Sequence, residues 1–252
     1  MPDREVLITA EDITVTYGEV TALDGVDFRL NSQEIVGLVG DNGAGKSTLI
    51  KCLSGVTQPD SGEIRIKGEA ANLSNPRDAK DKGIETAFQD LALADNMTVT
   101  QNIFLGREEV QHVGGILPFL DKGKMKQRTE ELLDRVNIDI SPDEKVKNLS
   151  GGERQLVAIS RTLLSDPDIV ILDEPTSALS VEGAEQVIDL IEGLREQGIS
   201  IILISHNFEI VKRVVDRMQI LYQGTNAGVL PSDAERDEIV SRMVAGQPQQ
   251  TA

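Results

Sequence analysis

Two groups of residues have the types and spacing that phosphate chemistry requires. The first is the run GDNGAGKS from Gly40 to Ser47, which matches G-x-x-x-x-G-K-[ST] between a predicted strand and a predicted helix. Its glycines let successive backbone N–H groups point at phosphate oxygens, and the helix N-terminus adds partial positive charge. Lys46 is then placed to bind the β- and γ-phosphates, and the Ser47 hydroxyl to bind Mg²⁺. This run predicts a nucleotide site.

The second group is the pair Asp173 and Glu174, which ends the apolar run 169–172. Ligands of open α/β sheets bind at the carboxyl ends of strands, so the pair is expected beside the phosphate loop. Asp173 suits Mg²⁺ bound through water, because this ion keeps much of its hydration shell. Glu174 suits a general base that polarises the attacking water, although a solvated acidic turn is the alternative. The pair favours hydrolysis over binding alone.

The elements that position these groups follow from hydrophobic periodicity. Residues 13–17 and 26–30 alternate apolar with polar residues, which is typical of half-buried antiparallel strands, whereas residues 35–39 are almost continuously apolar, as in a buried parallel strand. The other predicted strands are 6–8, 63–66, 84–89, 168–172, 199–204 and 217–222, and the other predicted helices of the alternating part are 46–55, 181–197 and 207–215. Such alternation predicts a parallel sheet with crossover helices.

The segment from about 95 to 150 differs, because its strands stop and helical patterns replace them. Thr98 and Gln101 form a capping-box start, and residues 124–136 have helical spacing. We interpret this segment as an inserted helical subdomain, and we expect a last helix to open at Ser232. The predicted chain is one domain, 1–252, with a core and β subdomain at 1–92 and 157–230, a helical subdomain at about 93–156, and a C-terminal helix and tail at 231–252.

The composition restricts the class of partner. The chain has 252 residues, 39% of them hydrophobic, and a net charge of −17, which argues against nucleic acid as a partner because phosphates would be repelled. Adaptation to high salt, where acidic self-repulsion is screened, is a second interpretation of the charge. The single cysteine, Cys52, excludes an internal disulfide and is expected to be a small buried side chain.

Hydropathy bears on the location of the chain. No apolar run approaches the roughly 18–20 residues that cross a bilayer, and the first residues lack the pattern of a secretory signal. We therefore expect a cytoplasmic protein, and any link to a membrane should come through a partner.

A third motif separates this chain from other nucleotide-binding proteins. The run LSGGERQ, from Leu149 to Gln155, lies about twenty residues before Asp173. Ser150 and Glu153 also fit a helix-capping box, which is compatible with a second anion-binding helix tip. The run resembles the LSGGE-x-Q signature of the ATP-binding-cassette (ABC) family, and the resemblance covers nearly the whole chain.

This resemblance implies an α/β P-loop NTPase fold, with a RecA-like parallel-sheet core, an N-terminal antiparallel β subdomain and an inserted helical subdomain. It also implies an ATPase that works as a head-to-tail dimer, in which the phosphate loop of one cassette and the signature of the other enclose each ATP. The residues expected to bind the nucleotide are Tyr17, Gly40, Asp41, Asn42, Gly43, Ala44, Gly45, Lys46, Ser47, Thr48, Ser150, Gly151 and Gly152.

Three positions receive a role only from the resemblance. Tyr17 stands where the family has an aromatic residue that stacks on adenine, Gln89 matches the glutamine that senses Mg²⁺ and γ-phosphate and contacts the permease, and His206 matches the switch histidine. The residues expected to act in catalysis are Glu174, His206, Gln89 and Lys46, and those expected at the Mg²⁺ ion are Ser47, Gln89 and Asp173.

The segment from Pro175 to Ser180 departs from the family pattern. It resembles the family's S-A-L-D segment, but Ser180 replaces the acid, so the coupling between the two sites is open. From the residues alone, Ser180 is a candidate N-cap of a helix that begins at Val181.

The segments 22–26, 88–93 and 102–108 are similar to those of importers of the ribose, xylose and fructose class. This similarity implies a cytoplasmic subunit, peripheral on the inner face of the cell membrane, with integral-membrane permease subunits and, indirectly, an extracytoplasmic solute-binding protein as partners. One cassette per chain implies a homodimer, and a heterodimer is the alternative. A single-cassette assembly ATPase with soluble partners, as in iron–sulfur biogenesis, is the rival function.

Overall fold

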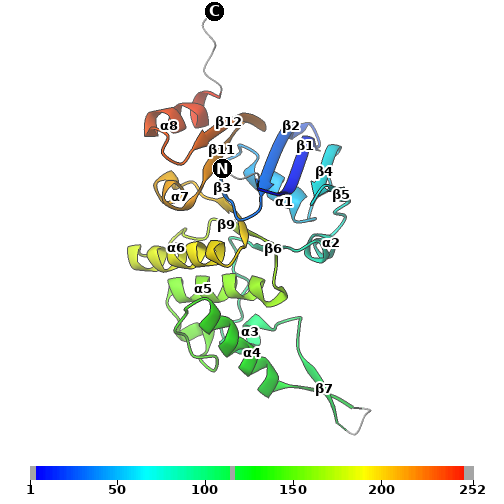
Figure 1. Ribbon diagram of the computed structural model, residues 1–252, viewed down its shortest axis with the longest axis vertical. Helices are drawn as coiled ribbons and strands as arrows, with labels where there is room; N and C mark the ends of the chain where they lie inside the picture. Colours follow the sequence, from blue (N-terminus) through cyan, green and yellow to red (C-terminus); the bar gives the residue numbers. More distant parts are fainter. Residues whose placement is uncertain (1–3, 114–116, 247–252) are drawn as a thin grey trace, which may run out of the picture. The chain divides into compact units, whose positions relative to one another are not determined.

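The computed structural model describes residues 4–113 and 117–246. The chain divides into two compact units (Figure 1). The first comprises Met1–Phe88, Pro167–Pro175 and Leu194–Ala252, and the second comprises Gln89–Asp166 and Thr176–Gly193. The second unit extends beyond the predicted helical segment 93–156 on both sides, and the predicted domain boundaries stay a prediction.

The helices are α1 (Lys46–Leu53), α2 (Pro76–Asp81), α3 (Val99–Ile103), α4 (Lys122–Arg135), α5 (Gly151–Thr162), α6 (Val181–Glu196), α7 (Phe208–Val214) and α8 (Arg236–Ala245). The strands are β1 (Val6–Tyr17), β2 (Val20–Asn31), β3 (Ile35–Val39), β4 (Ser61–Ile66), β5 (Glu69–Ala70), β6 (Ile84–Ala87), β7 (Val110–Val113), β8 (Leu117–Leu120), β9 (Ile169–Asp173), β10 (Ser200–Ile204), β11 (Arg217–Tyr222) and β12 (Thr225–Pro231). Among the described residues, no helix is both long enough and apolar enough to span a bilayer.

Two sheets build the first unit. One has the order β12-β11-β3-β10-β9-β6, with parallel pairing from β11 to β6 and β12 antiparallel at its edge. The other is antiparallel, with the order β2-β1-β4-β5. The central strands β3 and β10 are buried at every position, which explains why their sequences do not alternate. The structure thus contains both the parallel sheet and the antiparallel β subdomain that the periodicity predicts.

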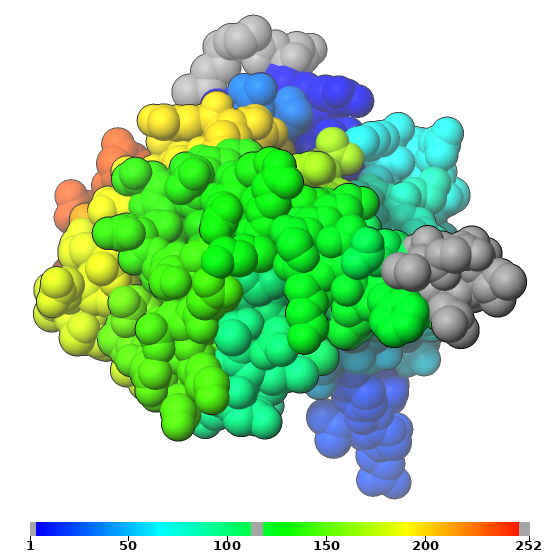
Figure 2. All heavy atoms as spheres, turned by 90° about the horizontal axis from the view of Figure 1, so that it is seen from below, coloured from blue at the N-terminus to red at the C-terminus, as the bar shows by residue number. Residues whose placement is uncertain are grey.

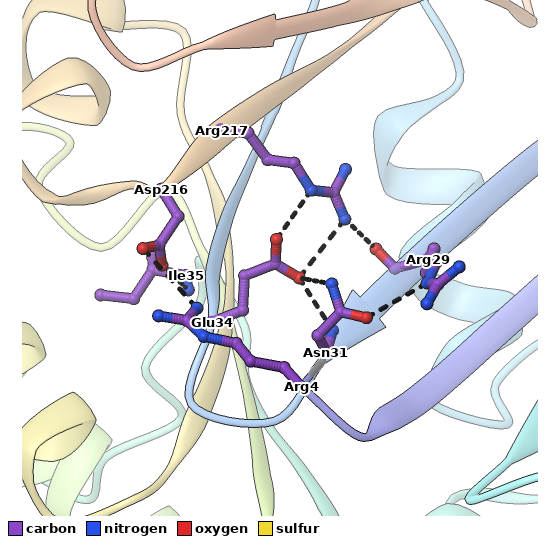
Figure 3. Close-up of polar contacts among 7 residues, drawn as sticks. All are labelled: Arg4, Arg29, Asn31, Glu34, Ile35, Asp216 and Arg217. Carbon is purple, nitrogen blue, oxygen red and sulfur yellow. Dashed lines mark hydrogen bonds and ion pairs between the residues drawn. The ribbon is translucent and has the colours of Figure 1, made fainter. Parts of the chain in front are cut away.

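Within the first unit, an ion pair between a half-buried arginine and a buried glutamate links the antiparallel sheet to the parallel one (Figure 3). The Nε of Arg217, on β11, lies 2.8 Å from Oε1 of Glu34, whose side chain is 6% exposed. The same guanidinium donates to the carbonyl of Arg29 at 2.6 Å, and Asn31 donates to Glu34 through its backbone and its side chain. Because the buried carboxylate and the half-buried guanidinium each have several partners, the pair links the two sheets without an unpaired buried charge.

In the second unit, α3 packs against α4 and α5, and the start of α5 contacts the start of α6. The predicted capping box of Thr98 and Gln101 is confirmed, since each residue bonds to the backbone of the other, at 3.2 Å and 2.9 Å. Figure 2 shows a face on which the teal segment that follows β6 lies beside the green helical residues.

Several sequence predictions are wrong. The strands do not stop between 95 and 150, because β7 and β8 form an antiparallel hairpin there. Residues 6–8 and 13–17 belong to one strand, β1, in which Asp12 adopts a left-handed φ of 55° at an irregularity that breaks the alternation. The last helix begins at Arg236 rather than Ser232, because the backbone after Pro231 first turns, with Ala234 N bonded to the Pro231 carbonyl at 3.2 Å.

Candidate nucleotide site

The predicted catalytic segments of the first unit converge because of strand register. Ile204, at the end of β10, is level with Leu38 of β3 on one side and with Asp173 of β9 on the other. The residues that follow these three strands therefore leave the same edge of the sheet. They are the loop from Gly40, the residue Glu174, and the segment of His206.

The phosphate loop is closed around its own lysine. Lys46 is 8% exposed, and its ammonium donates to the carbonyls of Gly40, at 2.8 Å, and Asp41, at 3.1 Å. Gly45 has a left-handed φ of 102°, and a side chain there would meet the Ala22 carbonyl at 2.9 Å, so only glycine fits. Asp41, Asn42, Gly43 and Ser47 are exposed, Thr48 is half-buried, and Ala44 is buried.

Burial and neighbouring charges set the ionisation of the two central groups. Desolvation lowers the pKa of Lys46, and the nearby carboxylates of Glu174, Asp41 and Asp173 oppose this shift. Desolvation raises the pKa of Asp173, with a further increase from Glu174, and the positive charges of Lys46 and Lys51 oppose it. Lysine and acid thus lie close enough to influence each other, as a site for phosphate and metal requires.

Glu174 and His206 form a pair at this edge. The Glu174 carboxylate accepts from the His206 backbone N–H at 2.9 Å and lies 2.8 Å from the ring Nδ1. An ionised carboxylate only accepts, so the ring Nδ1 is the donor in this contact. Glu174 has a left-handed φ of 52°, and its N–H donates to the Ile204 carbonyl at 2.9 Å. A non-glycine residue in this conformation is strained, which is common at functional sites.

Ser205 is a supporting residue that belongs to none of the sequence motifs. It directly follows β10, is 1% exposed, and its Oγ accepts from Asn207 N–H at 3.1 Å. This local turn fixes the backbone on both sides of His206. The signal in the sequence is the serine two residues before Asn207, whose backbone N–H needs a hydrogen-bond acceptor at the start of α7.

Tyr17 lies at the end of β1, opposite Val20 of β2, and is 49% exposed. Farther along β2, Ala22 and Leu23 are the residues that a side chain at Gly45 would meet. The strand that begins three residues after Tyr17 therefore adjoins the phosphate loop, and an aromatic ring this exposed is available for stacking.

The other predicted site residues belong to the second unit. Gln89 is exposed and follows β6 and Phe88, while Ser150 and Gly151 are exposed at the start of α5 and Gly152 is buried. The predicted capping box of Ser150 is present: its Oγ accepts from Glu153 N–H at 3.2 Å, and its N–H donates to Glu153 Oε2 at 2.7 Å. The backbone N–H groups of Gly151 and Gly152 stand at the tip of the helix, where an anion would be stabilised.

The tip of α5 packs closely on the start of α6. A side chain at Gly152 would lie 2.9 Å from the Cα of Gly183, so the two helices meet glycine to glycine. Ser180 caps α6, as predicted, because its Oγ accepts from Gly183 N–H at 3.2 Å. The serine that replaces the acid of the family pattern therefore has a structural role here.

The donors present suit a hydrated magnesium ion better than a protein-caged metal. Within the described residues, no group of three or more His, Cys, Asp or Glu side chains is placed to hold a metal. One exposed serine hydroxyl, at Ser47, and one carboxylate, at Asp173, are the kind of sparse oxygen set that Mg²⁺ uses when phosphates and water complete its shell.

Comparisons of the sequence give one consistent result. The model of the family described as ABC transporter matches residues 23–177. A xylose/arabinose import ATP-binding protein of Sulfolobus acidocaldarius is 43% identical over 220 residues, which are 86% of this chain and 85% of that protein. A fructose import ATP-binding protein of Rhizobium meliloti is 39% identical over 95% of this chain and 94% of its own length. The chain spans about half the length, 47%, of other curated relatives that it matches.

Solved structures agree on the fold. A crystal structure of an ATP-binding cassette in its ADP conformation aligns with a TM-score of 0.81 and 25% identity over 94% of each chain. A dimeric bacterial ABC transporter cassette aligns with a TM-score of 0.74 and 26% identity, covering 91% of this chain and 100% of that one. The predicted fold class, a P-loop NTPase core with an antiparallel β subdomain, is confirmed.

Proposed function

Because this chain belongs to the ABC transporter family, we propose that it is the ATP-hydrolysing subunit of a transporter that imports a monosaccharide. The observation that carries the hydrolytic part is the convergence of the Lys46 loop, the Asp173 carboxylate and the pair Glu174–His206 at one sheet edge. In this arrangement three different side chains are available to bind phosphate, to bind the metal ion and to act as the base.

The roles of these residues follow from their positions. Lys46, already held by loop carbonyls, exchanges that contact for the phosphates of ATP, while the loop N–H groups bind the same oxygens. Ser47 and Asp173, with Gln89, would hold Mg²⁺, which neutralises developing phosphate charge. Glu174 accepts a proton from the attacking water, and His206 holds the carboxylate in place. Tyr17 stacks on the base.

The partners also belong to the proposal. The exposed tip of α5, with Ser150 and Gly151, has free anion-binding character, and a similar cassette is dimeric. We therefore place two copies head to tail, so that each tip binds the nucleotide on the other copy's loop. Permease subunits, a solute-binding protein outside the membrane and attachment to its inner face complete the importer. The relatives named above are import ATP-binding proteins, which favours import over the assembly function with soluble partners.

Replacing the base tests the hydrolytic mechanism. Glu174→Gln should keep ATP affinity within about threefold, lower kcat by about 100-fold or more, and stabilise an ATP-bound dimer in size-exclusion chromatography, because a general base contributes about 10²–10⁴ in rate.

Lys46→Ala should instead weaken ATP binding by about 10- to 100-fold, since a charged hydrogen bond to phosphate is worth about 1.5–3 kcal/mol. Glu196→Gln, the same change on the exposed end of α6, should alter neither quantity. Unchanged turnover in Glu174→Gln would refute its assignment as the base.

A second experiment tests the importer. The chain should purify with a membrane permease, and a solute-binding protein loaded with a pentose or hexose should stimulate ATP hydrolysis by that complex. Copurification with soluble scaffold proteins instead, without stimulation by sugar, would select the assembly function.

A further inference from the structure

The loop that follows Gln89 is attached along one side of α5. Arg161 donates to two consecutive carbonyls of this loop, those of Leu91 at 3.0 Å and Ala92 at 3.1 Å. Farther along, Arg154 forms an ion pair with Asp95 at 3.7 Å. Residues seven apart lie on the same face of a helix, about 10.5 Å from each other, so the loop follows the helix axis.

The conformation of the loop needs these contacts. Ala92 has a left-handed φ of 47°, which is unfavourable for a residue with a side chain. Its N–H donates to Asp90 Oδ1 at 3.1 Å, and its carbonyl is one of the acceptors of Arg161. A strained residue persists when several contacts with the surrounding structure hold it, and the hydrogen bond from Arg161 is one of these contacts.

A third anchor joins the loop to α3. Asn102 is fully buried, accepts from Ala94 N–H at 2.7 Å, and donates to the Ala94 and Thr98 carbonyls at 3.1 Å and 3.0 Å. The loop is therefore fixed at its far end whether or not Arg161 is present. The part whose position depends on Arg161 is the part nearest Gln89.

The helix that carries Arg161 also carries the predicted phosphate-binding tip. Ser150 caps α5, and residues 155–160 of the helix are buried in the second unit. Eleven residue steps of continuous helix, about 16 Å, separate Ser150 from Arg161. A displacement of the loop at 91–92 is thus transmitted to the tip without another flexible joint.

We propose that Arg161 is a positioning residue that clasps the loop of Gln89 to α5, so that Gln89 and Ser150 move as one body during ATP turnover. This inference rests on the proposed function, in which Gln89 faces the metal and γ-phosphate and Ser150 the nucleotide of the partner copy. The position of the Ser150 tip, which binds the nucleotide of one site, then depends on whether ATP is bound near Gln89 in the other site.

Arg135 provides a matched control. Like Arg161, it lies in the last turn of its helix, where a cation complements the helix dipole. It also donates to a backbone carbonyl, that of Leu163 at 3.3 Å, and pairs with Asp166 at 2.6 Å. A purely structural role of Arg161 predicts similar behaviour for Arg161→Met and Arg135→Met.

Hydrogen exchange tests the clasp itself, in the full chain without nucleotide. Arg161→Met should speed exchange of the amides of residues 90–92 by about tenfold or more, because hydrogen bonds to a charged donor are lost, whereas the Ala94 amide, which Asn102 holds, should stay protected. Arg161→Lys keeps the charge but not the planar fork, so it should restore part of the protection. Arg135→Met should leave these amides unchanged. Equal exchange in wild type and Arg161→Met would overturn the clasp.

ATP turnover tests the consequence. Arg161→Met should lower kcat by about tenfold or more while ATP affinity, which depends on the phosphate loop, stays within about twofold; Arg135→Met should change neither. In a double-mutant cycle, Gln89→Ala with Arg161→Met should be no slower than Gln89→Ala alone, since both act through one loop. Independent, multiplying losses would overturn the coupling. A wild type that does not hydrolyse ATP would refute the proposed function, and the exchange experiment would still decide the clasp.

Discussion

At the scale of single residues, the candidate site holds charges that folding has partly removed from water. Lys46 is buried in its loop, and its pKa is lowered mainly by desolvation. Asp173, at the end of β9, has its pKa raised for the same reason. Each group is less stable charged than it would be in solvent, and a bound phosphate or cation would offset that cost. Such residues favour function at the expense of the stability of the empty protein.

Asp173→Asn should therefore stabilise the nucleotide-free protein. The pKa of Asp173 in the folded state lies above its ordinary value of 3.8. The folded protein therefore keeps the proton of this carboxyl more readily than the unfolded chain does. The stability that this preference contributes is fully present below pH 3.8 and is lost as pH rises through the folded pKa. The variant should melt at a higher temperature than wild type at pH 7.5, and the difference should shrink as pH falls toward about 4. Calorimetry from pH 4 to 8 measures this. Exposed Asp24→Asn is the control, and a lower melting temperature for Asp173→Asn at pH 7.5 would contradict the argument.

At the scale of elements, the contact between α5 and α6 locates the tip that carries Ser150. Gly152 and Gly183 bring the two backbones together, and Ser180 starts α6 with a cap at the same place. The two helix starts therefore share one packing contact. Even one added methyl group must move one helix start away from the other.

Gly152→Ala tests how tightly this contact is packed. The new methyl group would lie 2.9 Å from the Cα of Gly183, a backbone atom that cannot rotate away. We expect a loss of about 1–3 kcal/mol in the free energy of unfolding, as for other overpacked sites. Gly193→Ala, in α6 itself, meets nothing within 4 Å and should gain up to about 1 kcal/mol from helix propensity. Urea denaturation without nucleotide measures both, and equal changes of the same sign would argue against close packing.

The sequence predicts the elements whose local signals agree with their tertiary role. Strands β3 and β10 are apolar throughout because both of their faces are buried, and the boxes at Thr98 and Ser150 mark two helix starts correctly. The missed strands share another feature, because they contain residues that usually disfavour strands. β12 contains Gly228 and ends at Pro231, yet it pairs with β11, and β8 contains Pro118 but pairs with β7. The contacts of Arg161 with Leu91 and Ala92 join residues about seventy positions apart, so no local pattern reveals them.

For the site itself, spacing alone marks the lysine loop and the acidic pair, because their chemistry needs neighbours along the chain. The pairing of Glu174 with His206 comes instead from the adjacency of β9 and β10. His206 receives its role in the sequence from the resemblance alone, and no sequence pattern predicts its contact with Glu174.

At the scale of the whole molecule, charge is the dominant feature. The chain carries 42 acidic and 25 basic residues, which gives 25 − 42 = −17. Along α6, Glu182, Glu185, Asp189, Glu192 and Glu196 recur at helical spacing, so like charges adjoin on one face. Pairs of this kind destabilise a helix by about 0.2–0.5 kcal/mol each, and salt screens them.

The stability of the protein should therefore rise with ionic strength. Between 0.01 M and 1 M KCl the screening length falls from about 30 Å to about 3 Å, so repulsion among exposed carboxylates is largely removed. We expect the melting temperature to increase, and the double variant Asp189→Asn, Glu192→Gln to melt about 1–4 °C above wild type at low salt with a smaller response to KCl. Glu63→Gln, which removes the partner of Arg65 at 2.7 Å, should not raise it. A melting temperature that is the same in dilute buffer and in molar salt would exclude the interpretation of the acidic surface as an adaptation to high salt.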